Sequence, residues 1–291
     1  MAESIILCSD TQILDQMTTT TLTVDGAVHH LKIWASEDAR AGILIIHGHG
    51  EHSGRYGHLA SAFNEAGIES WAMDLYGHGQ TEGKRGHVPR YDLFWDSIDA
   101  TLSSMREKLG DKPLFLFGHS MGGNIVASYT MKRQPKLQGI LLSGAYFRLA
   151  FTPTTSQLLL ARVGKLLMPS LTQPSKLDVK GLSRDAEEVK MYVADPLIHE
   201  MISPALFSGI TENGDYILNN AKDWKHPVII AHGSDDPVTS FEASKDLFDG
   251  IPEGVDKTWK PMPGSVHEMH NDLDREEIIH TYRDWMVERI K

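Results

Sequence analysis

Short runs of apolar residues, most of them ending at glycine, recur along the chain and limit its fold more than any other feature. Such runs lie within residues 43–48, 69–74, 113–118, 139–144 and 227–233. Their apolar residues are continuous and do not alternate with polar ones. This pattern is typical of strands that are buried on both faces of a parallel sheet. The sequence therefore predicts a mostly parallel central sheet.

Helical patterns separate these runs. Residues 94–108, 123–132 and 275–289 each carry apolar side chains at the spacing of one helix face. Strands that alternate with helices in this way predict an α/β fold with helices on both faces of the sheet. Earlier in the chain, the strand-like segments 20–24 and 29–34 flank Asp25-Gly26. That arrangement indicates an antiparallel hairpin leading into the sheet.

One long stretch breaks the alternation. Between Gly144 and Pro227 about eighty residues pass without a good strand, far more than a crossover connection needs. We interpret residues 147–210 as a helical cap inserted over the strand ends, with a pair of ordinary surface helices as the alternative. The chain then divides into an extension of unknown role (1–19), a core (20–146), the cap (147–210) and the rest of the core (211–291). Apolar residues of this segment include Leu158, Leu159, Val163, Leu166 and Leu167; they either form an exposed apolar rim or are buried against the rest of the cap.

Composition excludes several classes of protein. A formal charge of -11 argues against a general nucleic-acid role, because phosphate binding requires a basic face. The single cysteine, Cys8, cannot form an internal disulfide, which fits a reducing compartment. No segment approaches the roughly 18 apolar residues that span a bilayer, and residues 1–10 lack the basic start of a signal peptide. We expect a cytoplasmic protein whose cap makes at most transient contact with a membrane surface; the oligomeric state is not predicted.

The motif Gly118-His119-Ser120-Met121-Gly122 has the pattern G-x-S-x-G. It follows an apolar strand directly and precedes a helix directly, so the chain must turn sharply at Ser120. Glycines two residues before and two after the serine relieve the crowding at such a turn. The turn exposes the hydroxyl at a helix N-terminus, where amide dipoles favour developing negative charge. We therefore predict that Ser120 is a nucleophile; the alternative is a glycine-rich turn with a capping serine.

A serine hydroxyl needs a base to remove its proton, and the base needs a carboxylate to hold it. His267 is the best candidate for the base because it follows a strand-like segment and a turn and precedes the last helix; His270 is its nearest competitor. The carboxylate is expected in Gly233-Ser234-Asp235-Asp236, at the end of another strand. Local reasoning leaves Asp235 and Asp236 both open.

An oxyanion formed on the substrate requires two converging donors. One is expected to be the amide of Met121, the residue after the nucleophile. The other is expected from the loop His47-Gly48-His49-Gly50, through the amide of His49. The same loop permits a competing hypothesis, since His47, His49 and His52 resemble the H-x-H-x-D-H zinc motif of metallo-β-lactamases, with Glu51 in the place of the aspartate. The zinc hypothesis leaves the strand–serine–helix context unexplained.

Taken together, these motifs resemble those of the monoacylglycerol lipase family within the α/β-hydrolase superfamily, which is also close to lysophospholipase-like esterases. The resemblance covers about residues 40–290. The matching segments are 47–56 (His-Gly-His-Gly-Glu-His-Ser-Gly-Arg-Tyr), 77–83 (Gly-His-Gly-Gln-Thr-Glu-Gly), 118–123 (Gly-His-Ser-Met-Gly-Gly), 195–198 (Asp-Pro-Leu-Ile) and 233–236 (Gly-Ser-Asp-Asp).

The resemblance implies an α/β-hydrolase fold with a mobile, apolar-rimmed cap that admits an acyl chain. It selects Asp236 over Asp235, matches His267 as the base, and matches His49 and Met121 as oxyanion donors. Residues that recognise the glycerol head group in the family map onto Glu51, Arg55, Tyr192 and His270. From the sequence alone, Glu51 and Arg55 are spaced i, i+4 and also suit a simple ion pair.

The sequence thus predicts a serine hydrolase that cleaves an ester through an acyl-enzyme intermediate and without metal or organic cofactor. The resemblance implies that the ester is a fatty acyl ester, namely a monoacylglycerol. A lysophospholipase or a broad carboxylesterase with the same triad is the alternative. A different class of function, a catalytically silent fold that binds a lipid, stays open because a fold alone does not fix function.

Overall fold

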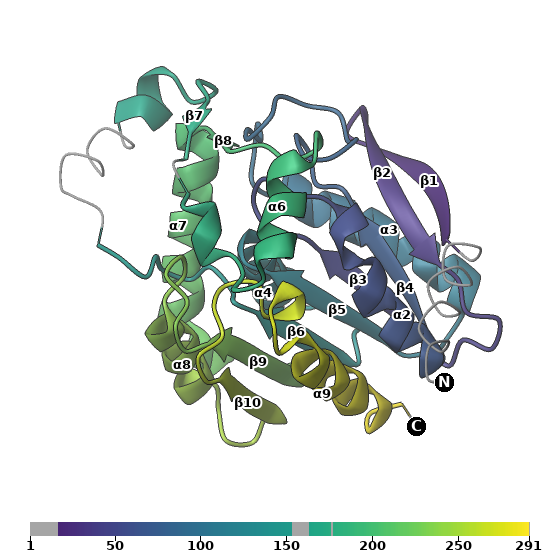
Figure 1. Cartoon of the computed structure of the whole chain (residues 1–291). Coiled ribbons are helices and arrows are strands. Elements are labelled where there is room, and N and C mark those ends of the chain that lie inside the picture. Colours follow the sequence, from purple (N-terminus) through teal and green to yellow (C-terminus); the bar gives the residue numbers. More distant parts are fainter. Residues whose placement is uncertain (1–16, 153–162, 176, 291) are drawn as a thin grey trace, which may run out of the picture.

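Eight strands form one central sheet in the order β1-β2-β4-β3-β5-β6-β9-β10 (Figure 1). The structure is a computed structural model that describes residues 17–152, 163–175 and 177–290. All neighbours from β4 to β10 are parallel, whereas β1 with β2 and β2 with β4 are antiparallel. The predicted mostly parallel sheet is therefore confirmed. The strands are β1 (Met17–Val24), β2 (Ala27–Trp34), β3 (Ala41–Ile46), β4 (Ile68–Met73), β5 (Leu114–His119), β6 (Gly139–Ser143), β9 (Val228–Gly233) and β10 (Lys257–Met262).

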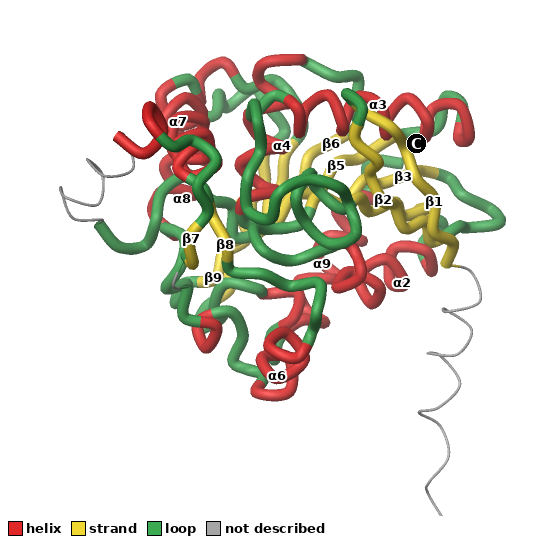
Figure 2. The backbone as a smooth tube through the Cα atoms, turned by 90° about the horizontal axis from the view of Figure 1, so that it is seen from above, coloured by secondary structure: helices red, strands yellow, loops and turns green. Residues whose placement is uncertain are grey.

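Helices cover both faces of this sheet, which explains why its strands are continuously apolar. Side chains of β3 alternate between two core clusters, with Leu44 and Ile46 in one and Ile43 and Ile45 in the other. Figure 2 shows the helices on the two sides of the sheet. The first cluster includes residues of α3 (Leu93–Leu109), α4 (Met121–Arg133), α7 (Pro204–Asn219) and α8 (Phe241–Gly250); the second includes residues of α2 (Gly57–Glu65) and α9 (Arg275–Val287).

The hairpin of β1 and β2 turns at Asp25-Gly26, as predicted. Both residues have positive φ, 51° and 80°, which is the combination that a tight two-residue hairpin requires. The first strand begins at Met17, three residues before the predicted start and inside the predicted extension 1–19. Residues 1–16 of that extension lie outside the described part of the chain.

Between β6 and β9 the chain leaves the sheet and contributes α6 (Ala186–Ala194), the short helix η2 (Val179–Gly181) and two paired two-residue strands, β7 (Gln173–Pro174) and β8 (Met201–Ile202). This segment lies against the loop after β3, since the His199 amide donates to the Gly50 carbonyl and the His52 imidazole bonds to Asp195. The cap residues Leu158 and Leu159 lie outside the described ranges. None of the helices within those ranges has the length and hydropathy that crossing a bilayer demands.

The helix α7 crosses the predicted end of the cap at residue 210. Its buried side chains Leu206, Ile210 and Ile217 join the core cluster of α3 and α4. Because its buried side chains pack on the sheet, α7 belongs to the core. Judged by these contacts, the cap ends near Ser203, whose side chain caps the start of α7. The other domain limits stay a prediction.

Replacing Gly26 by alanine tests the hairpin turn. A Cβ at this position meets no atom within 4 Å, so the cost is backbone strain alone. We expect Gly26→Ala to lower the free energy of unfolding by about 1 kcal/mol, measured by urea denaturation. Gly254→Ala is the control, because Gly254 also has open space around it but no positive φ; its change should stay within about 0.5 kcal/mol. Equal midpoints for the two variants would contradict the assigned turn.

Candidate active site

Ser120 stands where β5 turns into α4, and its backbone is left-handed. Its φ of 52° and ψ of −119° are rare for a residue with a side chain. Three backbone hydrogen bonds hold it there. The Ser120 amide donates to Ser143 in β6, while its carbonyl accepts from the amides of Asn124 and Tyr146. The predicted strand-to-helix turn is thus present, and it presents the serine side chain at the N-terminus of α4.

The flanking glycines are required by close backbone contacts. A Cβ on Gly118 would lie 2.5 Å from the carbonyl oxygen of Gly122. A Cβ on Gly122 would lie 2.2 Å from the carbonyl oxygen of Ile46, at the end of β3. Because backbone atoms cannot move aside as a flexible side chain can, neither position tolerates a larger residue. The helix α4 is therefore pressed against the ends of β3 and β5.

His267 reaches the serine from the loop that follows β10. Its Nε2 lies 2.9 Å from the Ser120 Oγ, and its Nδ1 lies 2.7 Å from Asp236 Oδ2. All three side chains are at most 8% exposed. The neighbouring Asp235 is exposed and accepts a hydrogen bond from the Ser234 hydroxyl, so it does not reach the imidazole. The structure thus brings together Ser120, His267 and Asp236 from the predicted set.

The carboxylate of Asp236 is held at both oxygens. Its Oδ1 accepts from the backbone amides of Val238 and Thr239, at 2.7 and 3.0 Å. Its Oδ2 also receives the Thr239 hydroxyl at 2.8 Å and the Nε2 of His232 at 3.0 Å. Sequence reasoning missed Thr239 and His232. The only available signal was that His232 stands four residues before the aspartate, at the end of an apolar strand.

Burial and charge act against each other in this line of groups. Burial alone favours neutral Asp236, but the nearby His267 and the hydrogen bond from His232 hold the pKa of Asp236 well below its ordinary value. Burial alone also disfavours protonated His267, yet the carboxylates of Asp236, Glu268 and Glu51 raise the pKa of His267 above 6.5. The imidazole is thereby a stronger base than an ordinary histidine.

The loop after β3 lies directly beside the serine. A Cβ on Gly48 would be 3.2 Å from the Cβ of Ser120. Within the described ranges, neither the amide of His49 nor that of Met121 donates to any group. The Gly48 amide, in contrast, donates to Glu51 Oε1 at 2.6 Å, which fixes the turn of this loop. The amides of the two predicted oxyanion donors are therefore left without an acceptor among the described residues.

The four residues predicted for a head group occupy different environments. Arg55 bonds to Glu51 at 3.0 Å and forms two hydrogen bonds with Glu268, at 2.8 and 2.6 Å. The guanidinium also lies 4.8 Å from the centre of the Tyr192 ring, a cation–π contact. His270 is fully buried, and both its ring nitrogens are shielded from solvent. Glu268 was missed by sequence reasoning, because only the fold brings it to Arg55.

The zinc hypothesis finds no support in the loop geometry. The Nδ1 of His47 lies 2.7 Å from the Gly48 carbonyl, and its Nε2 accepts from the Leu75 amide. The Nε2 of His52 bonds to Asp195, and its Nδ1 accepts from the Gly54 amide. Among the residues that the structure describes, no group of three or more His, Cys, Asp or Glu side chains has the arrangement to hold a metal ion.

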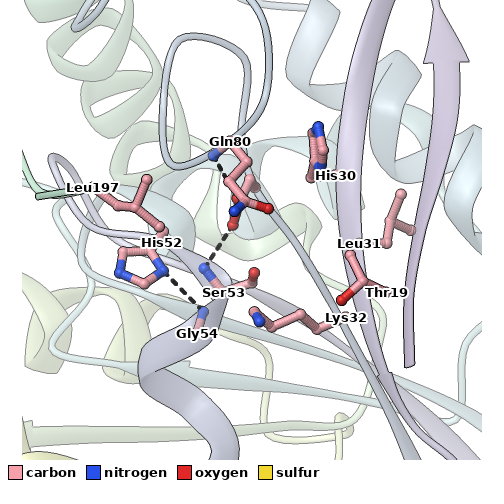
Figure 3. Close-up of a pocket in the computed structure, with 10 residues that line it drawn as sticks. Thr19, His30, Leu31, Lys32, His52, Ser53, Gly54, Gln80 and Leu197 are labelled. Atoms are coloured by element: carbon pink, nitrogen blue, oxygen red, sulfur yellow. Dashed lines mark hydrogen bonds between the residues drawn. The ribbon is translucent and has the colours of Figure 1, made fainter. Parts of the chain in front are cut away.

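Two small cavities adjoin the loop after β3. One of about 70 Å³ lies between this loop and β2 and is lined by Lys32, His52 and Gln80 among others (Figure 3). It is lined by none of Ser120, Asp236 and His267, so the catalytic chemistry lies elsewhere. The other cavity, of about 40 Å³, joins His49 to Tyr192 and His199 of the cap segment. The cap segment therefore meets the core at the loop after β3.

Comparison with known proteins assigns the chain to a family. Residues 37–274 match a family model described as serine aminopeptidase, S33 (Hydrolase_4). An uncharacterised abhydrolase domain-containing protein of Dictyostelium discoideum is 32% identical over 93% of this chain; the chain spans 29% of that relative. A monoacylglycerol lipase of Mycolicibacterium smegmatis is 28% identical, over 89% of this chain and 92% of the relative.

Among solved structures, the crystal structure of a monoacylglycerol lipase from Paleococcus ferrophilus is similar to this chain. It is 34% identical, with a TM-score of 0.82, and the alignment covers 90% of this chain and 99% of that one. The shared fold therefore extends over nearly the whole chain.

Replacing one of two adjacent aspartates tests the hydrogen-bonded series of Ser120, His267 and Asp236. We expect Asp236→Asn to lower kcat/KM for a p-nitrophenyl ester by about 10⁴-fold, because the amide disfavours the protonated His267. Asp235→Asn is the matched control and should stay within about twofold, because its side chain is exposed.

In the unsubstituted enzyme, the acidic limb of the pH profile should have its midpoint above 6.5, since neutral His267 is the active form and its pKa is raised. Activity is lost as the pH falls through that value. A midpoint below 6.5, or equal activities of the two asparagine variants, would contradict the assignment.

Proposed function

The chain belongs to the α/β-hydrolase family described as serine aminopeptidase, S33, and we propose that it hydrolyses a monoacylglycerol to glycerol and a free fatty acid. The observation that carries the proposal is the buried line from Ser120 Oγ through His267 to Asp236, with contacts of 2.9 and 2.7 Å. The substrate class is supported by two similar proteins, which are described as monoacylglycerol lipases.

The geometry suits a two-step acyl transfer. Ser120 Oγ attacks the ester carbonyl carbon while His267 Nε2 takes the hydroxyl proton. The carbonyl oxygen becomes negative and receives the amides of His49 and Met121 at the N-terminus of α4. Protonated His267, stabilised by Asp236, then gives the proton to the departing glycerol oxygen. Water repeats the sequence on the acyl-enzyme, releases the fatty acid and restores Ser120; the residues of this chain and water balance every step.

The charges near the nucleophile favour an uncharged head group. Arg55 is shared by Glu51 and Glu268, so one positive charge faces two negative ones. A lysophospholipid would bring a phosphate toward this net negative network, and like charges repel in a buried site. Glycerol carries hydroxyls only, and the Arg55 guanidinium and Tyr192 hydroxyl are the groups we assign to receive them. Glu51 acts through the Gly48 amide on the loop after β3. The His270 ring stacks on Tyr56, whose hydroxyl donates to Glu51.

A hydrolysis panel tests the proposed substrate. Monoacylglycerols of several chain lengths, diacylglycerols, lysophosphatidylcholine and an aminoacyl p-nitroanilide are compared at equal concentration. We expect monoacylglycerol to be turned over at least about tenfold faster than the others, and Ser120→Ala to reduce turnover by about 10⁴-fold or more. Preference for the anilide would indicate a peptidase. Preference for lysophosphatidylcholine would remove the head-group assignment and leave the triad intact.

We further propose that the cap segment contacts lipid surfaces. Within residues 163–171, four apolar side chains are more than half exposed: Leu166 (82%), Leu167 (68%), Met168 (54%) and Leu171 (54%). Exposed apolar side chains grouped in one short segment are typical of interaction surfaces. A monoacylglycerol is itself dispersed in membranes or micelles, so a surface that enters the interface would place the enzyme at its substrate.

A double substitution tests this contact. We expect Leu166→Ser with Leu167→Ser to lower activity on vesicle-borne long-chain monoacylglycerol several-fold, because less apolar area enters the lipid. Activity on a soluble short-chain ester should be unchanged. Leu273→Ser is the control, since Leu273 is also exposed (63%) but precedes α9 on the core. Equal losses on both substrates, or the same loss in the control, would contradict the proposed contact.

A further inference from the structure

A second imidazole bonds to the carboxylate that holds the proposed base. His232 is the fifth residue of β9 and is completely buried. Its Nε2 lies 3.0 Å from Asp236 Oδ2, the same oxygen that receives His267 Nδ1 at 2.7 Å. Asp236 thus stands between two histidine rings, only one of which contacts the serine. A polar ring placed here in an otherwise apolar strand requires an explanation.

The neighbours of His232 fix which nitrogen carries its proton. Nε2 faces two acceptors, the Asp236 carboxylate and, at 3.2 Å, the carbonyl oxygen of Thr239. The Thr239 hydroxyl is farther from Nε2, at 3.4 Å, and donates to Asp236 Oδ2 at 2.8 Å instead. A nitrogen between two acceptors must be protonated, because neither partner can donate to it. Nδ1 lies 2.7 Å from the Ser244 hydroxyl, which can donate. The ring is therefore a donor toward Asp236, held in that tautomer by Ser244 from α8.

The bond from His232 is not needed merely to orient the carboxylate. Asp236 Oδ1 is already fixed by the amides of Val238 and Thr239, and the Thr239 hydroxyl lies 2.8 Å from Oδ2. What His232 adds is a second N–H on the oxygen that serves His267. A carboxylate oxygen that shares its charge with two donors attracts each of them less strongly than it would attract one.

The surroundings of His267 make such sharing useful. Three carboxylates, from Asp236, Glu268 and Glu51, favour its protonated form. The other titratable rings that face it or its neighbours, His119 and His270, are buried, and the ring of His119 lies 4.8 Å from that of His267. Burial and the adjacent His267 lower the pKa of His119 to about 4, so it contributes no positive charge at neutral pH. An imidazole protonated too readily cannot act as a base.

We propose that His232 is a positioning residue which, by donating to Asp236 Oδ2, keeps His267 available as a base at neutral pH. It touches neither substrate nor the serine and acts only through Asp236. The inference rests on the proposed serine hydrolase chemistry but not on the identity of the acyl substrate. The expected direction of the pH shift is definite. Loss of the Nε2 donor leaves more negative charge on Oδ2 for His267, so protonated His267 is stabilised and its base form appears only at higher pH.

The test compares variants that keep or lose the donor. His232→Gln places an amide N–H near the position of Nε2, whereas His232→Met fills similar space without a donor. The readout is the pH dependence of Ser120 labelling by a fluorophosphonate, and of kcat/KM for a soluble p-nitrophenyl ester. We expect the acidic limb of His232→Met to move upward by about one pH unit, with KM unchanged within about twofold, and that of His232→Gln to stay near the original.

Two further variants complete the experiment. His226→Met is the matched control. His226 precedes β9, and its Nε2 bonds to the Pro135 carbonyl and not to Asp236. The acidic limb of the pH profile of this variant should not move. If His232→Met is not recovered as folded protein by thermal unfolding, His232→Asn replaces it, since the shorter amide can still bond to Ser244 but falls short of Asp236. Its limb should also move upward.

The outcomes separate this inference from the proposed function. An absence of labelling at Ser120 in the unsubstituted protein would overturn the hydrolase chemistry and the inference with it. If Ser120 is labelled but the acidic limb of the pH profile stays in place or moves to lower pH in folded His232→Met or His232→Asn, the inference alone is overturned. Equal upward shifts in His232→Met and His232→Gln would also overturn it, because the donor would then be irrelevant.

Discussion

The close approach of α4 to the ends of β3, β5 and β6 is the constraint on which the site depends. Gly122 lies against the carbonyl of Ile46, and Gly123 lies so close to Ala145 that a Cβ would be 2.6 Å from the Ala145 Cβ. This contact forces the left-handed backbone of Ser120, which is the N-cap residue of α4 and therefore stands at the helix N-terminus. Because the strands are parallel, the loops after β3, β9 and β10 leave the sheet at the same edge. The proposed nucleophile, base, carboxylate and oxyanion donors therefore come from four loops at one edge of the sheet.

Burial at this rim gives the charges their effect. In a site shielded from water, a carboxylate and an imidazole interact much more strongly than at a surface. Asp236 can stay ionised there only because every lone pair has a donor, from two backbone amides, a hydroxyl and two imidazoles. The same burial opposes the protonation of His119 and His49, whose pKa values it lowers to about 4 and about 3. The basic character of the site is thus concentrated on His267, because among the residues that the structure describes only that ring bonds to a carboxylate and also reaches Ser120.

A feature of the fold or the site could be predicted from the sequence where a local pattern of residues determines it. The strands and the turn at Ser120 follow from local runs of residue types, and the segment after the last strand narrows the base to His267, with His270 as its competitor. The choice between Asp235 and Asp236 does not, because adjacent residues point in different directions and only the fold decides which one meets the imidazole. Glu268 and His232 were missed for the same reason: their partners, Arg55 and Asp236, are brought to them by tertiary packing. The predicted cap limit at residue 210 fell inside α7, since an amphipathic helix looks alike in the sequence whether it packs on a cap or on the sheet.

Glu51 links the loop after β3, which carries the His49 amide, to Arg55. One of its oxygens accepts from the Gly48 amide and the Tyr56 hydroxyl, at 2.6 and 2.7 Å, and the other accepts from Arg55. Burial would raise its pKa, but Arg55 and the neighbouring groups lower the pKa of Glu51 to about 2, so the carboxylate is ionised throughout the neutral range. The turn that carries the His49 amide is therefore tied, through one charged side chain, to the guanidinium that we assign to the head group. Because the Gly48 amide bonds to Oε1 and Arg55 bonds to Oε2 of the same carboxylate, the turn of this loop and the position of Arg55 share one buried anchor.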